Sequence, residues 1–319
     1  MAAELPRALK AAIDRELAGA SRRDLADRTA ATTEAYRAGR GSASVIKGRE
    51  DALAYALARL PATYAACGAV FAEARRTAPD FAPRSLLDAG CGPGGGSWAA
   101  REAWGSLDAI AWFDASAPFL DLAKRLAGDD LAATSTRGDL AAGPFPRADL
   151  VLASYALAEI SPAAQPRVVA SLWAATEGLL AIVEPGTPAG YARLLAAREA
   201  LIAAGATILA PCPHHLACPL TAPDWCHFSV RLPRSRDHKL AKGAEVPFED
   251  EKFAYLLAAR PGVATEPRAP RVLARPKAGK PGIELKLCTE PGALERRFVP
   301  RRDKAAHAIA RRLDWGDAL

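Results

Sequence analysis

The 319-residue chain contains no run of eighteen consecutive apolar residues, which argues against a membrane-spanning helix. Its N-terminal segment is not poor in acids either, because Glu4, Asp14, Glu16 and Asp24 stand among the basic residues. This composition is typical neither of a secretory signal nor of an acid-poor organellar presequence. We therefore expect a cytoplasmic protein without a membrane span.

Cysteine and histidine are also scarce, with six and five residues. Three of each nevertheless fall within residues 212–227, whose sequence is CPHHLACPLTAPDWCH. Thiols stay reduced in the cytoplasm, so clustered cysteines favour a metal site over disulfides. This segment leaves four possibilities: a disulfide, a zinc ion, an iron–sulfur cluster, or unligated thiols.

Positive charge is unevenly placed along the chain, whose net charge is +6. Residues 229–312 hold twenty Lys and Arg against ten Asp and Glu, whereas the rest of the chain holds 22 against 26. A basic C-terminal quarter is typical of proteins with an anionic partner, most often nucleic acid. The alternative is a solvated, arginine-rich surface.

The hydrophobic pattern divides the chain into three regions. Residues 1–80 read as helices, with an interruption at Pro61. Residues 81–262 alternate short apolar strands with helices, which predicts an α/β domain with a mostly parallel sheet covered on both faces. Residues 263–319 form a basic extension, in which residues 283–288 alternate as a strand with Cys288 opposite the apolar face.

The cysteine-rich segment, taken as residues 211–227, is an insertion within the middle region. We expect it to connect strands at residues 206–210 and 225–232, at the edge of the sheet. Residues 249–257 begin with acids and are predicted to form a helix.

A glycine-rich loop, DAGCGPG at residues 88–94, lies between a predicted strand and a predicted helix. Glycines let a ligand approach the backbone, and the start of a helix offers unpaired N–H groups. The glycine spacing alone fits NAD, S-adenosylmethionine or an empty nucleotide fold. Asp114 ends the next strand, where a carboxylate binds ribose hydroxyls in either cofactor class.

The acid two residues before the first glycine resembles motif I of class I S-adenosylmethionine-dependent methyltransferases. That resemblance implies a Rossmann-like fold and a cofactor site formed by Asp88, Gly90, Gly92, Gly94, Asp114 and Asp139. Ser154 and Tyr155 follow the fourth strand in place of the Asn/Asp-Pro-Pro-aromatic motif of amino-methylating enzymes. No catalytic residue is therefore predicted, and methyl transfer stays an open question.

Four cysteines stand apart from the helical core, namely Cys212, Cys218, Cys226 and Cys288. Their loose spacing differs from the paired Cys-x2-4-Cys knuckles of zinc ribbons and suits a larger cluster better. The three nearby histidines keep zinc open as a second metal, and buried unligated thiols are the third possibility.

Several motifs in the same order resemble the methyltransferase-like small-ribosomal-subunit assembly proteins of bacteria and mitochondria, the methyltransferase-like protein seventeen type. They are LPATY (60–64), LDAGCGPG (87–94), VEPGTP (183–188), CPH (212–214), CP (218–219), DWCHFS (224–229), EDEKFAYL (249–256), LC (287–288) and WGD (315–317). The resemblance implies that the four cysteines hold a 4Fe-4S cluster and that the protein binds the small ribosomal subunit during assembly.

The resulting hypothesis is a small-subunit assembly factor with an S-adenosylmethionine-binding domain and a structural 4Fe-4S cluster. By the resemblance, ribosomal RNA is the anionic partner, contacted by Arg231, Arg234, Arg236 and Lys239 beyond the third cysteine. One alternative is an active RNA or small-molecule methyltransferase with a structural metal site. Another is a zinc-stabilised binding module with an empty cofactor pocket. The oligomeric state is not predicted.

Overall fold

The computed structural model describes residues 4–37 and 41–319. Its helices and strands occur in the order α1 (Arg7–Leu17), α2 (Arg22–Arg37), η1 (Ser42–Ser44), α3 (Arg49–Thr77), β1 (Ser85–Ala89), α4 (Gly95–Ala103), β2 (Ala109–Asp114), α5 (Ala117–Ala127), β3 (Ala133–Arg137), β4 (Ala148–Ser154), η2 (Leu157–Glu159), α6 (Gln165–Ala175), β5 (Thr176–Pro185), α7 (Pro188–Ala203), β6 (Thr207–Ala210), β7 (Phe228–Pro233), α8 (Arg236–Lys242), β8 (Phe248–Ala259), β9 (Arg271–Val272), β10 (Lys277–Ala278), β11 (Gly282–Cys288), β12 (Leu294–Pro300) and α9 (Lys304–Ala310). Within the described ranges, every helix is too short or too polar to cross a membrane.

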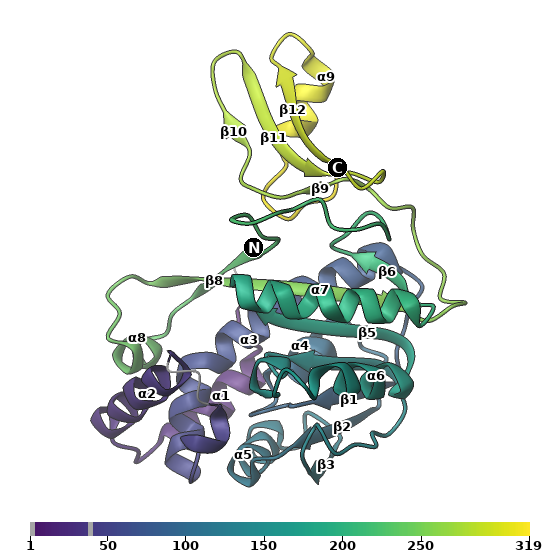
Figure 1. Ribbon diagram of the computed structural model, residues 1–319. Coiled ribbons are helices and arrows are strands. Elements are labelled where there is room, and N and C mark those ends of the chain that lie inside the picture. The colour runs from purple at the N-terminus through teal and green to yellow at the C-terminus, as the bar shows by residue number, and fades with distance from the viewer. Residues whose placement is uncertain (1–3, 38–40) are drawn as a thin grey trace.

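The central sheet has the strand order β3-β2-β1-β4-β5-β8-β6, and β7 also pairs with β8. Strands β1 to β5 are parallel to one another, whereas β8 runs antiparallel to β5. Helices α3, α4 and α5 cover one face and α6 and α7 the other (Figure 1). The predicted Rossmann-like α/β fold is therefore confirmed. Strands β2 and β4 lie on opposite sides of β1, so the strand order reverses at β1. In sheets of this kind, ligands bind at the carboxyl ends of the strands where the order reverses.

The central strands are apolar on both faces because helices cover both. In β4, whose sequence is ADLVLAS, Leu150 and Leu152 pack in the cluster that contains α4, whereas Val151 and Ala153 pack in the cluster that contains α6. A strand buried on both sides reads as a nearly continuous apolar run, which is the pattern that predicted it.

Helix α3 differs from the prediction in being unbroken. Pro61 lies inside it, although an interior proline costs about 3 kcal/mol because it removes a backbone hydrogen bond. Leu53, Leu60 and Phe71 are among many buried residues along the helix. Their packing offsets the cost of the proline, so the helix continues through it.

The predicted helix at residues 249–257 is wrong, because these residues lie in strand β8. Residues 253–259 are all buried, paired with β5 on one side and with β6 and β7 on the other. The acidic residues 249–251 resemble the first turn of a helix, but pairing in the sheet outweighs this local preference. The predicted strands at 206–210 and 225–232 are confirmed as β6 and β7, so residues 211–227 connect strands at the sheet edge.

A second, smaller sheet lies near the C-terminus, with β11 between β12 and the short strands β9 and β10. Figure 1 shows it set apart from the central sheet, with α9 beside it. Ile283, Leu285 and Leu287 pack against α9 in their own hydrophobic cluster. The strand predicted at residues 283–288 is confirmed, with Cys288 at its end.

Candidate cofactor loop and thiol centre

The glycine-rich loop connects β1 to α4 at the carboxyl edge of the sheet. Gly90, Gly92 and Gly94 have φ angles of 77°, 53° and 87°, a region that glycine adopts without strain. A Cβ atom on Gly90 would also lie 2.8 Å from the Cβ of Ala156. The backbone itself therefore requires glycine here, and it places the N–H groups at the start of α4 beside the loop.

Asp114 joins the end of β2 to this loop. Its carboxylate accepts hydrogen bonds from the N–H of Gly92 and the N–H of Ser116, both at 2.8 Å. Burial raises the pKa of Asp114, and the two N–H groups oppose that shift. The carboxylate that sequence reasoning assigned to ribose binding thus lies against the glycine loop.

Asp88 lies beneath the loop and is fully buried. Its Oδ2 accepts a hydrogen bond of 2.6 Å from the Ser97 hydroxyl, while Oδ1 has no partner among the described residues. Burial raises the pKa of Asp88 to about 7. Most buried carboxylate oxygens have a hydrogen-bond partner, so the unpartnered Oδ1 sets Asp88 apart from an ordinary core residue.

The last predicted cofactor residue, Asp139, lies just beyond β3 and is exposed. Its carboxylate accepts the N–H of Ala141 at 2.8 Å, and the N–H of neighbouring Gly138 donates to the Asp114 carbonyl at 3.0 Å. The turn that carries Asp139 is therefore attached directly to the end of β2.

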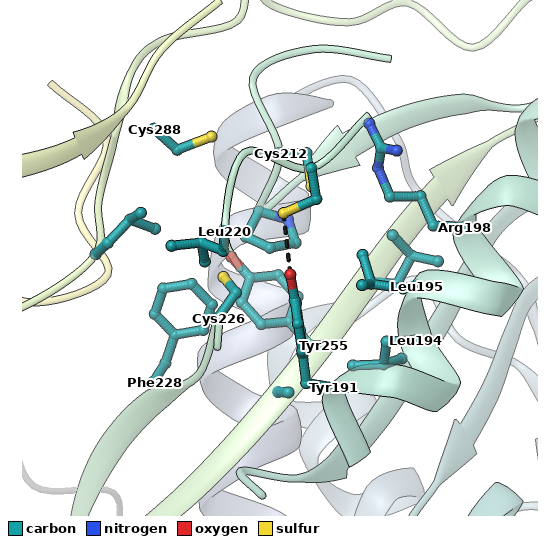
Figure 2. Close-up of a pocket in the computed structure, with 15 residues that line it drawn as sticks. Tyr191, Leu194, Leu195, Arg198, Cys212, Leu220, Cys226, Phe228, Tyr255 and Cys288 are labelled. Atoms are coloured by element: carbon teal, nitrogen blue, oxygen red, sulfur yellow. Dashed lines mark hydrogen bonds between the residues drawn. The ribbon is translucent and has the colours of Figure 1, made fainter. Parts of the chain in front are cut away.

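The four predicted metal ligands lie around one cavity (Figure 2). Cys212, Cys218 and Cys226 come from the connection between β6 and β7, and Cys288 comes from the C-terminal sheet. None of the six cysteines is in a disulfide in the structure. In the described parts of the chain, no three His, Cys, Asp or Glu side chains lie close enough together to hold one metal ion.

Burial raises the pKa of three of these thiols. It raises the pKa of Cys288 to about 12 and that of Cys226 well above its usual value. The pKa of Cys212 is also raised by burial, although the nearby Arg198 guanidinium opposes the shift. Thiolates here need cations around them, and binding of a metal would release protons.

Two buried arginines lie beside the thiols. Arg198 is 3% exposed, and its Nη2 donates to the carbonyls of His214 and Leu216 at 2.7 and 2.9 Å. Arg271 is 2% exposed and pairs with Glu73 of α3 at 2.8 Å. Arg198 therefore fixes the cysteine-rich connection, and both guanidiniums lower the cost of negative charge in the cavity.

The histidines of this connection have other contacts. His215 accepts the N–H of Ile208 at 3.0 Å, and His227 stacks on Trp225 with ring centroids 4.9 Å apart. His214 alone approaches a thiol, with its Nε2 3.4 Å from the Cys288 sulfur. Tyr191 is a further neighbour, whose hydroxyl donates to the Cys218 sulfur at 3.1 Å.

The four predicted RNA-contacting residues lie in and after β7. Arg231 makes two hydrogen bonds to Asp250, at 2.7 and 2.8 Å, and Arg234 pairs with Glu249 at 3.3 Å. Arg236 is exposed at the start of α8, and Lys239 is half-buried. Two of the four charges are thus neutralised within the protein.

A family description, mitochondrial small ribosomal subunit Rsm22, matches residues 49–319. The chain belongs to the Rsm22 family. It is 31% identical, over 291 residues, to the human mitochondrial ribosome assembly protein METTL17, a match that covers 84% of this chain and 62% of the human protein. The resemblance that the sequence motifs indicated is therefore confirmed.

Solved structures similar to this Rsm22-family chain include magnesium protoporphyrin IX methyltransferase from Synechocystis with bound S-adenosylmethionine. The identity is 16%, the TM-score 0.42, and the match covers 62% of this chain and 80% of that one. Precorrin-6y C5,15-methyltransferase from Geobacter metallireducens has 14% identity and a TM-score of 0.40. That match covers 60% of this chain and 85% of the other.

Sequence reasoning missed three features of this Rsm22-family site. Tyr191 and Arg198 lie seven residues apart on α7 and both face the thiols, so their helical spacing was a usable signal. Tyr155 directly follows β4 with a φ of 57°, and its hydroxyl donates to Glu251 at 2.9 Å. Positive φ in a residue other than glycine often marks a functional site, but it cannot be read from sequence.

Proposed function

We propose that this chain is an assembly factor of the small ribosomal subunit, with a methyltransferase-like domain that binds S-adenosylmethionine and a structural 4Fe-4S cluster. The observation that carries the proposal is that four cysteines, three from one segment and one 62 residues further along, line the same cavity in a chain of the Rsm22 family. We infer the small subunit as the partner from the relative's name and from the basic C-terminal region. The cytoplasm is the expected compartment.

The thiol cavity fits a polynuclear cluster by its donor chemistry. Four cysteines are the ligand set of a 4Fe-4S cluster, and all four line the same largely apolar cavity. Arg198 and Arg271 supply buried positive charge next to an anionic group, and the Tyr191 hydroxyl supplies a hydrogen bond to one sulfur. Ligation by Cys288 would attach the C-terminal sheet to the central sheet.

The glycine loop fits S-adenosylmethionine through Asp88, Asp114 and the loop backbone. The sulfonium of the cofactor already activates its methyl group, so transfer to a good nucleophile requires mainly positioning. The glycine loop with Asp88 and Asp114 is the observation that favours methyl transfer as a second candidate function. Transfer of labelled methyl groups to ribosomal RNA distinguishes it from cofactor binding alone.

Replacement of Asp114 by asparagine is expected to weaken S-adenosylmethionine binding about tenfold, because hydrogen bonds to ribose hydroxyls lose the assistance of the negative charge. Isothermal titration calorimetry on the full chain measures this change. Asp121→Asn, at an exposed position of α5, is the matched control and should leave affinity unchanged. Equal affinity of Asp114→Asn and the wild type would contradict the assignment.

The assembly function is tested by co-sedimentation with isolated small-subunit particles. Binding should be detectable at about 50 mM salt and at least about tenfold weaker at about 200 mM, because each phosphate contact releases counterions. Large-subunit particles are the control for non-specific adhesion to RNA. Absence of co-sedimentation at low salt, or equal binding to both subunits, would refute the function.

A further inference from the structure

The C-terminal sheet has two unlike faces. One face packs Ile283, Leu285, Leu287 and Val299 against α9. On the other face, Lys277 of β10 lies opposite Glu284 of β11, which lies opposite Phe298 of β12. Arg296, two residues before Phe298, shares this side. We call Lys277, Glu284, Arg296 and Phe298 the outer face.

The outer face exposes an aromatic ring. Phe298 is 54% exposed, and its Cζ would lie 2.8 Å from a Cβ atom built on Gly282. The tip of the ring therefore covers a glycine on the neighbouring strand, where a side chain would clash with it. Much of the aromatic surface stays accessible beside Arg296, whose side chain is 71% exposed and pairs with Glu284 of β11 at 3.0 Å.

The excess positive charge of the protein lies in this region. Residues 271–319 hold twelve Lys and Arg against six Asp and Glu, while residues 1–270 hold thirty of each. The whole net charge of +6 therefore comes from the last 49 residues. A surface with this balance is complementary to a polyanion.

Figure 1 shows the C-terminal sheet projecting from the central sheet, with the turn between β10 and β11 and the turn after β12 at its far end. The N–H of Arg301 donates to the carbonyl of Pro281 at 2.9 Å, so the turn after β12 lies beside the turn between β10 and β11. The exposed cations on these two turns and the start of α9 are Lys280, Arg301, Arg302 and Lys304. They continue the positive surface from the outer face.

We propose that the outer face and this basic end bind single-stranded RNA, with an unpaired base stacked on Phe298 and phosphates contacted by the surrounding cations. Exposed aromatics on a sheet surface serve unstacked bases, whereas a duplex would use the charges alone. The inference rests on the proposed function for its partner. It places the contact at a different surface from Arg231 and Arg234, which lie in and just after β7.

Fluorescence anisotropy tests the proposal with the full chain and a labelled oligoribonucleotide of about twelve nucleotides, within the site size of single-strand-binding sheets. Phe298→Ala should weaken binding about tenfold, because one stacked base is lost. Phe298→Leu keeps an apolar side chain over Gly282 but should lose a similar amount, whereas Phe298→Tyr should stay within about twofold of wild type. Ile309→Ala removes an equally exposed apolar residue, on α9, and should change nothing.

The same RNA as a duplex should bind more weakly and should not respond to Phe298→Leu. The proposal is overturned if wild-type protein does not bind the single strand at about 50 mM salt. It is also overturned if Phe298→Leu binds like wild type, or if Ile309→Ala loses as much. Co-sedimentation of Phe298→Leu and Ile309→Ala with small-subunit particles then separates the stacking surface from the assembly function. If the anisotropy results overturn the stacking surface while co-sedimentation is unchanged, the assembly function stands on its own.

Discussion

Cys226→Ser is expected to reduce bound iron to less than about one quarter of the wild-type content and to abolish the broad thiolate-to-iron absorbance near about 400 nm. Cys226 lines the cavity together with the other three thiols, and a serine hydroxyl is a poorer ligand for iron than a thiolate. Because metal binding is coupled to folding, loss of the cluster should also lower the unfolding temperature by about 10 °C or more. Anaerobic purification with iron analysis, absorbance and thermal unfolding measures all three effects.

Cys67→Ala is the matched control for this prediction. Cys67 is fully buried in α3 and does not line the thiol cavity. Its replacement should cost about 1 kcal/mol through a small void and leave iron content unchanged. Full iron content in Cys226→Ser, or one zinc ion and no iron in the wild type, would refute the cluster.

Arg271→Met is expected to lower the free energy of unfolding by about 3–5 kcal/mol, because it removes one member of a buried charged network. The Arg271 side chain pairs with Glu73 of α3 and donates to the carbonyls of Pro211 and Gly316, at 3.1 and 2.7 Å. One guanidinium thus joins the N-terminal helices, the cysteine-rich connection and the C-terminus. Methionine fills similar volume but leaves both carbonyls without this donor.

Denaturant unfolding of the full chain measures this loss, and Arg275→Met provides the comparison. Arg275 lies four residues later and is exposed, so its replacement should change stability by no more than about 0.5 kcal/mol. Arg271→Lys keeps the charge but lacks the planar fork that reaches three partners, and should be intermediate. An Arg271→Met protein as stable as the wild type would show that the network contributes no net stability.

The failed helix at residues 249–257 and the unbroken α3 have a common physical origin. In both cases a local signal, a group of acids or a proline, was correctly identified but outweighed by burial. β8 is held by neighbours on both sides, and α3 packs many apolar residues along its length. Local preferences of about 1–3 kcal/mol are outweighed by the many buried contacts of β8 and α3.

The sequence by itself determined the α/β fold, the glycine loop and the set of four cysteines, because strand and helix periodicities and glycine spacing are local properties of the chain. Only the tertiary structure decided which charges stay available. Arg231 meets Asp250 through the pairing of β7 with β8, and Arg271 meets Glu73 across almost two hundred residues. Phe298 is exposed because α9 covers the opposite face of its sheet. Such contacts depend on strand register and packing between distant segments, which composition and spacing do not encode locally.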